Sequence, residues 1–212
     1  MRITKFGHAC VRVEHDGVRV VVDPGCFTDR AAVEGADAVL ITHVHPDHYD
    51  VDHLRATSAA IHTIDQVAQA IANDAPDLAD RVHVVRPGDT LDVGVPVEVI
   101  GDKHAVIHRD YPRFDNSGYL LTLGGQSVFH PGDSLTLPGR AVDVLLAPVS
   151  APWLKVGEAV DFVRDVAAPR TLAIHDRVYS DVGLDMVETH LTNLALGDGR
   201  SFARLADGAD LD

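Results

Sequence analysis

One short segment, Thr42–His48, constrains this chain more than any other part of it. Its sequence, THVHPDH, spaces histidines and an aspartate as H-x-H-x-D-H directly after the apolar residues Ala38–Ile41. The apolar run predicts a buried strand, so the motif would lie on the loop that leaves the strand's C-terminal end. Neutral imidazole nitrogens and carboxylate oxygens suit zinc and similar divalent ions. The segment predicts a metal site; the alternative is a histidine-rich surface loop, because the chain has 13 histidines among 212 residues.

Further residues of metal-binding type follow other predicted strands. They are His104 after residues 95–100, Asp133 after residues 126–130 and His175 after residues 171–174. A carboxylate that follows a glycine, as Asp133 does, can approach two cations at once. Instead of binding a metal, Asp133 could be an ordinary turn aspartate, and His175 could be a histidine that follows a strand by chance. Residues of metal-binding type follow four predicted strands, and this repetition favours a shared metal site.

The rest of the pattern predicts alternating strands and helices. Turns at Asp16-Gly17 and Gly124-Gly125 join apolar segments and predict hairpins. Helices are expected over residues 50–56, 65–72, 158–167 and 184–196. Strand followed by helix is the layering of an α/β sandwich.

The motif and its companions resemble those of the metallo-β-lactamase-fold hydrolases. Beside H-x-H-x-D-H, the likeness rests on Gly7-His8-Ala9-Cys10, Asp23-Pro24, His104, Gly132-Asp133-Ser134 and Ile174-His175-Asp176, in that order. It extends from Ile3 to His175 and is strongest for a compact branch that includes ascorbate-6-phosphate-lactonase-like proteins. The resemblance implies a four-layer αββα sandwich of the metallo-β-lactamase type, with a dinuclear metal site between the two sheets.

The resemblance also implies a division of ligands between two ions. One ion would be held by His43, His45, His104 and a shared Asp133; the other by Asp47, His48, His175 and the same Asp133. His108 is the alternative to His104, which strand-end position and family order favour. Zinc is the first expectation for both ions, with manganese, nickel or iron as alternatives.

The expected function is that of a metal-dependent hydrolase. A hydroxide that bridges the two ions would attack a small ester, lactone or phosphoester substrate. Asp47 and Asp133 are the candidate catalytic carboxylates, and a separate role of Asp47 in orienting the hydroxide or carrying its proton stays open. Ser134 lacks the G-x-S-x-G context of a nucleophile. A non-catalytic metal-binding or sensing domain of the same fold is the second hypothesis.

Other residues have less certain roles at this stage. His8 is either a loop histidine or a neighbour of the site. Asp23 is either a turn residue or, as in the family, an acceptor that supports a ligand histidine. Trp153 is a pocket wall or a core cap. Lys103, Arg109 and Arg113 are solvated or orient an anionic group of the substrate.

Length and charge restrict the remaining choices. At 212 residues the chain suits one domain, residues 1–212. A net charge of −14 disfavours a nucleic-acid partner, which clustered Lys and Arg would bind, and favours a small-molecule substrate. No apolar run is long enough for a membrane span or a secretory signal, so a cytoplasmic location is expected. The sequence does not indicate the oligomeric state.

His45 stands where oxygen- or NO-reducing di-iron relatives carry glutamate, which disfavours a redox function.

Overall fold

Two mixed β-sheets pack face to face in the computed structural model, which describes residues 1–211. The first sheet contains β1 (Arg2–Lys5), β2 (Val11–His15), β3 (Val18–Val22), β4 (Ala38–Ile41), β5 (Ala60–Thr63) and β6 (Val82–Val84), in that spatial order. The second contains β7 (Thr90–Asp92), β8 (Pro96–Ile100), β9 (Gly118–Leu123), β10 (Gln126–His130), β11 (Val144–Pro148), β12 (Arg170–Ile174) and β13 (Ser201–Ala203). Strands β3 to β6 run parallel to one another, as do β10 to β13.

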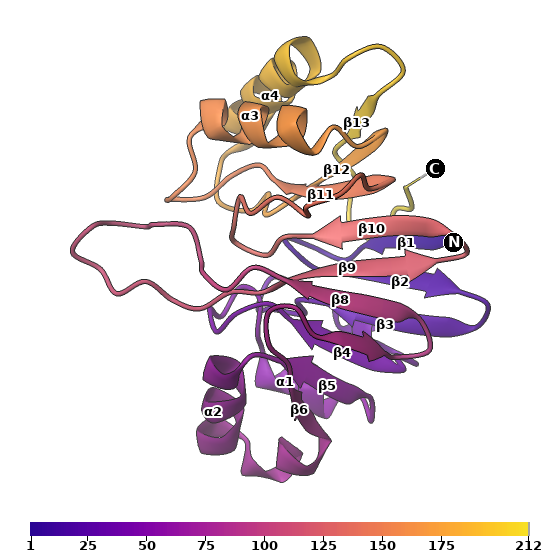
Figure 1. The fold of residues 1–212 in the computed structure, drawn as a ribbon. Helices are drawn as coiled ribbons and strands as arrows, with labels where there is room; N and C mark the ends of the chain where they lie inside the picture. Colours follow the sequence, from indigo (N-terminus) through magenta and orange to yellow (C-terminus); the bar gives the residue numbers. More distant parts are fainter. Residues whose placement is uncertain (212) are drawn as a thin grey trace.

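Helices cover the outer face of each sheet, which gives four layers (Figure 1). The first sheet carries α1 (Val51–Arg55) and α2 (Asp65–Asp74); the second carries α3 (Val156–Val166) and α4 (Asp181–His190). Short 3₁₀ segments occupy Arg30–Val33 and Pro76–Arg81, and a π-helical turn, Leu191–Ala195, continues α4. The expected αββα sandwich is confirmed.

The alternation of side chains along each central strand builds these layers. In β4, which is buried throughout, Leu40 belongs to the core between the sheets, whereas Val39 and Ile41 pack with residues of α1 and α2. In β11, Leu146 faces the inner core and Leu145 packs beneath α3. Successive residues of a strand point to opposite faces, so a strand with helices on one side and a sheet on the other must be apolar at every position.

Both predicted hairpins form, and each uses its turn residues for positive φ. Asp16 and Gly17 have φ of 49° and 87° between β2 and β3, and Gly124 and Gly125 have 57° and 80° between β9 and β10. Such values are what two-residue hairpin turns require. The predicted helices are present, but α3 and α4 begin before residues 158 and 184, and residues 191–195 are π-helical. Within residues 1–211, no helix is both long and apolar enough to cross a membrane.

Candidate metal centre

The candidate ligands leave one edge of the sandwich, where the parallel strands end. The loop after β4 carries His43, His45, Asp47 and His48. Asp133 lies three residues beyond the end of β10, and His175 directly follows β12. His104 comes after the antiparallel strand β8. Neighbouring parallel strands finish at the same edge of a sheet, so residues far apart in the sequence meet there.

The first group of side chains contains His43, His45, His104 and Asp133. Their ligand atoms all lie within 4.8 Å of one another. Nε2 of His43 is 3.1 Å from Nδ1 of His45, and Nε2 of His104 is 3.3 Å from Oδ2 of Asp133. The rival His108 has a 64% exposed side chain beside Asp110 and does not belong to this group. The structure therefore places His104 with the motif histidines.

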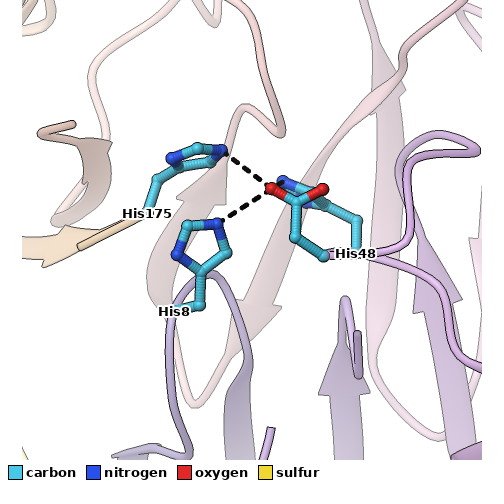
Figure 2. Close-up of side chains that lie close together, drawn as sticks. His8, His48 and His175 are labelled. Carbon is cyan, nitrogen blue, oxygen red and sulfur yellow. Dashed lines mark hydrogen bonds and ion pairs between the residues drawn. The ribbon is translucent and has the colours of Figure 1, made fainter. Parts of the chain in front are cut away.

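The second group contains His8, Asp47, His48 and His175, again within 4.8 Å of one another. In Figure 2, dashed lines join the imidazoles of His8 and His175 to one carboxylate oxygen, and Nε2 of His48 lies 3.9 Å from the same oxygen. That oxygen, Oδ2 of Asp47, is 3.0 Å from Nε2 of His8 and 3.4 Å from Nε2 of His175. Asp47, His48 and His175 are predicted ligands. His8 is a neighbour of the site, which is one of the two roles that the sequence left open for it.

Asp133 lies between the two groups. Its Oδ1 is 3.1 Å from Nε2 of His48, and its Oδ2 is 3.2 Å from Nε2 of His175 as well as close to His104. The carboxylate therefore contacts histidines of both groups, as a shared ligand would. Nε1 of Trp153 also donates a hydrogen bond to Asp133 Oδ2 at 3.0 Å. Neither proposed role of Trp153 anticipated this bond, and no sequence pattern signals it.

The outer nitrogens of the site histidines are occupied by acceptors. Nδ1 of His48 is 2.7 Å from Asp23 Oδ2, Nδ1 of His104 is 2.6 Å from the carbonyl of Ala105, and Nδ1 of His175 contacts the carbonyl of Ser150. Carboxylate and carbonyl oxygens can only accept, so each Nδ1 carries a proton and Nε2 faces the centre. Asp23 thus takes the supporting place that the resemblance gave it.

His43 is oriented in the same sense through a hydroxyl group. Thr42 Oγ1 donates to Asp23 Oδ2 at 2.7 Å and lies 3.0 Å from Nδ1 of His43. Because the hydroxyl proton is used toward Asp23, the oxygen accepts from His43. Its Nε2 is therefore also left for the centre.

Several inward-facing atoms lack a hydrogen-bond partner within residues 1–211. They are Nε2 of His48, His104 and His175 and Oδ1 of Asp133, all buried. Their contacts with one another are close but poorly directed for hydrogen bonds. Unsatisfied polar atoms are costly inside a protein. Imidazole nitrogens and carboxylate oxygens in one place form a donor set that divalent cations would satisfy, so the residues present fit two such ions.

Charges at the centre are strongly coupled in the metal-free protein. Burial alone would raise the pKa of Asp133, but the imidazoles of His175 and His48 outweigh it and hold that pKa well below its usual range. Burial would lower the pKa of His175, yet Asp133 and Asp47 raise it to about 9. The pKa of His48 is also raised, because Asp133 and Asp23 outweigh burial. Protonated imidazoles thus balance the negative charge of the carboxylates, as bound cations would.

Basic side chains near the site are mostly committed to the protein. Lys103 pairs with Asp115, and Nε of Arg113 donates to the carbonyl of His104 at 2.7 Å. The side chain of Arg109 is 87% exposed. Its Nε lies 3.8 Å from Oδ2 of Asp110, whose side chain is also largely exposed.

Comparison with known proteins places the chain in a family. Residues 2–175 match the family described as the β-lactamase superfamily domain. A protein of Mycobacterium tuberculosis, Rv0786c, is 36% identical over 93% of this chain and 94% of its own length. A UPF0173 protein of Pyrococcus abyssi is 31% identical over 80% of each chain. The chain therefore belongs to the β-lactamase superfamily and, within it, to the UPF0173 family.

More distant comparisons agree on the fold. A relative from Aeropyrum pernix, 27% identical over 85% of this chain and 86% of its own, is named a UPF0173 metal-dependent hydrolase. The structure of Igni18, described as a metallo hydrolase from Ignicoccus hospitalis, superposes with a TM-score of 0.75 at 18% identity, and the match covers 99% of this chain and 97% of that chain. At that identity the likeness concerns the fold alone.

Proposed function

We propose that this protein is a metal-dependent hydrolase with a dinuclear centre. The observation that carries the proposal is the pair of His/Asp groups, each within 4.8 Å, that meet at the buried carboxylate of Asp133. A relative that is named a UPF0173 metal-dependent hydrolase supports the hydrolase part of this proposal. A protein that needed these residues for stability alone would have no reason to bury them with their nitrogens unsatisfied.

The ligand assignment follows the two groups. His43, His45 and His104 would hold one ion, Asp47, His48 and His175 the other, and Asp133 would contact both. Two divalent ions in such a site lower the pKa of water and polarise the group that is attacked. Zinc is the first candidate, and manganese, nickel and iron accept the same donor set.

The protein's own residues prepare the site for this chemistry. Asp23 and Thr42 hold the imidazoles of His48 and His43 in the tautomer that presents Nε2. Neighbouring imidazoles hold the pKa values of Asp133 and Asp47 below the usual range and so favour the charged carboxylates. The strands that lead into the site end in buried apolar residues, Ile41 before Thr42 and Ile174 before His175.

Substrates would approach from the side of His45 and Asp47. Asp47 has a 24% exposed side chain and His45 is half-buried, whereas His43, His48, His104 and His175 are buried. The loop after His104 contains Phe114, whose ring centroid lies 4.5 Å from that of His45, and it also carries exposed Val106, Ile107, Tyr111 and Arg109. A small substrate that combines an apolar part with an anionic group, such as a carboxylic ester, a lactone or a phosphoester, fits these surroundings. A lactone would agree with the resemblance to ascorbate-6-phosphate-lactonase-like proteins.

Turnover by the metal-loaded protein tests the proposal. The assay compares p-nitrophenyl acetate with bis(p-nitrophenyl) phosphate, beside metal content per chain. We expect about two ions per chain and hydrolysis that His45→Ala and Asp133→Ala abolish while His190→Ala, on the exposed face of α4, retains it. Less than half an ion after reconstitution would contradict the dinuclear centre. About two ions with no turnover of either substrate, or of a lactone panel, would favour the non-catalytic alternative.

A further inference from the structure

His8 belongs to the second group by distance, but its surroundings differ from those of the other histidines. It lies in the turn between β1 and β2, fully buried, with a φ of 49°. The preceding Gly7 has a φ of 109°, and a Cβ there would lie 2.4 Å from the carbonyl oxygen of Phe27. The amide of Cys10 closes the turn on Gly7 at 2.8 Å. The backbone therefore fixes where the imidazole points.

Both nitrogens of the His8 ring are engaged. The backbone amide of Arg177 donates to Nδ1 at 3.2 Å, and Nε2 lies 3.0 Å from Oδ2 of Asp47. The amide of His175 also donates to the carbonyl of His8 at 3.0 Å. The turn is thus attached to the loop after β12 through its backbone and through its ring.

These bonds determine which ring nitrogen carries the proton. A backbone amide can only donate, so Nδ1 of His8 must present its lone pair. The proton of the ring then resides on Nε2 and points at Asp47. His48, His104 and His175 have the opposite arrangement, with Nδ1 protonated and Nε2 facing the centre. A nitrogen that bears a proton cannot also bind a metal ion.

We propose that His8 is not a metal ligand but a positioning residue that donates Nε2–H to Asp47 and fixes the orientation of that carboxylate. The inference rests on the proposed dinuclear centre and assigns its second ion to Asp47, His48, His175 and Asp133. Of the two nitrogens near Oδ2 of Asp47, that of His8 is the closer, and that of His175 is the one an ion would take. Without His8, the partly exposed carboxylate would be free to rotate toward solvent.

Substitutions of His8 distinguish a hydrogen-bond donor to Asp47 from a metal ligand. His8→Gln keeps an N–H near the position of Nε2, whereas His8→Leu removes it with similar bulk; His190→Gln on α4 is the matched control. We expect His8→Leu to retain two ions at saturation but to bind the second about 10- to 100-fold more weakly, the usual effect of losing a bond to a ligand. His8→Gln should recover most of that affinity, measured by competition with a chromophoric chelator. Loss of one ion from both variants, or equal affinity in His8→Leu and the parent, would overturn the proposal.

An NMR measurement on the parent protein avoids any effect of substitution on folding. Long-range ¹H–¹⁵N spectra of the zinc-loaded protein should show His8 with a protonated Nε2 and an unprotonated Nδ1. A deprotonated Nε2 with a metal-bound shift would overturn the proposal and make His8 a ligand. Failure of the parent to bind about two ions would instead refute the dinuclear centre on which the inference rests.

Discussion

Nδ1 of His48 lies 2.7 Å from Oδ2 of Asp23, and both side chains are fully buried. Because Asp23 also accepts from the amide and the hydroxyl of Thr42, its carboxylate is held in place on both oxygens. In Asp23→Asn, an amide NH₂ at the position of Oδ2 would oppose the Nδ1 proton and favour the other tautomer of His48, with its proton toward the centre. We expect metal affinity to fall about 10- to 100-fold.

Chelator competition would measure this change. Asp80→Asn, at an exposed position after α2, is the matched control and should bind metal as the parent does. Asparagine tolerates the positive φ of residue 23, which is 52°, so the fold should be retained. Unchanged affinity in Asp23→Asn would show that Asp23 does not orient His48.

Gly25 lets the backbone of the metal-binding loop approach closely. A Cβ at this position would lie 2.0 Å from both the carbonyl carbon and oxygen of Asp47. Gly25→Ala must therefore displace the segment that carries Asp47 and His48. We expect weaker binding of the second ion and a loss of about 1–3 kcal/mol in the free energy of unfolding, as for other overpacked sites. Urea denaturation and metal titration would measure both effects.

Gly157 is the control for that substitution. It lies in α3 with a negative φ and open space around the position of a Cβ. Gly157→Ala should leave metal binding unchanged and either preserve or slightly raise stability, because alanine is the better helix former. Equal behaviour of the two variants would contradict the close approach at Gly25.

Metal binding should release protons at neutral pH. His175 has a pKa of about 9 in the metal-free protein and must lose its Nε2 proton to bind an ion. The protonated His175 stabilises the metal-free fold. This contribution is fully present below the pKa of histidine in the unfolded chain, about 6.5, and it is lost as pH rises through about 9. The increase in melting temperature on adding zinc should therefore grow between pH 6.5 and 9. Calorimetry in buffers of different ionisation enthalpy would count the released protons; no release at pH 7 would contradict the raised pKa.

Tryptophan fluorescence should report on the centre directly. Trp153 is the one tryptophan of the sequence, and its Nε1 donates to Asp133. Cations that bind the same carboxylate would change the charge beside the indole. We expect the emission to change during zinc titration until about two equivalents are bound. Emission that stays constant while metal content rises would place the ions elsewhere.

Local patterns predict the alternation of strands and helices and the motif ligands, and the resemblance to metallo-β-lactamase-fold hydrolases predicts the αββα sandwich. The apolar residues Ala38–Ile41 determine a strand by composition, and the histidines and aspartate that follow are recognisable by spacing. Strand-end position and family order favour His104 over His108, and the structure places His104 in the group. Metal binding by any of these residues stays a prediction.

The contacts of His8 and Trp153 could not be predicted from local patterns. His8 reaches Asp47 because two left-handed residues, His8 and His175, bring the first turn against the loop after β12. Trp153 reaches Asp133 across a long sequence separation from an irregular loop. Such contacts depend on where loops meet after the sheets have packed, and hydrophobic periodicity contains no information about that.

The bond from the amide of His175 to the carbonyl of His8 also has a consequence for the order of folding. It closes a loop that spans most of the chain, and contacts of this kind form late because much of the polypeptide must be ordered first. During synthesis, His43, His45 and Asp47 leave the ribosome long before His175 exists. We therefore expect the centre to be completed only after the second sheet has assembled, so that the ion held by His175 is the later of the two to bind.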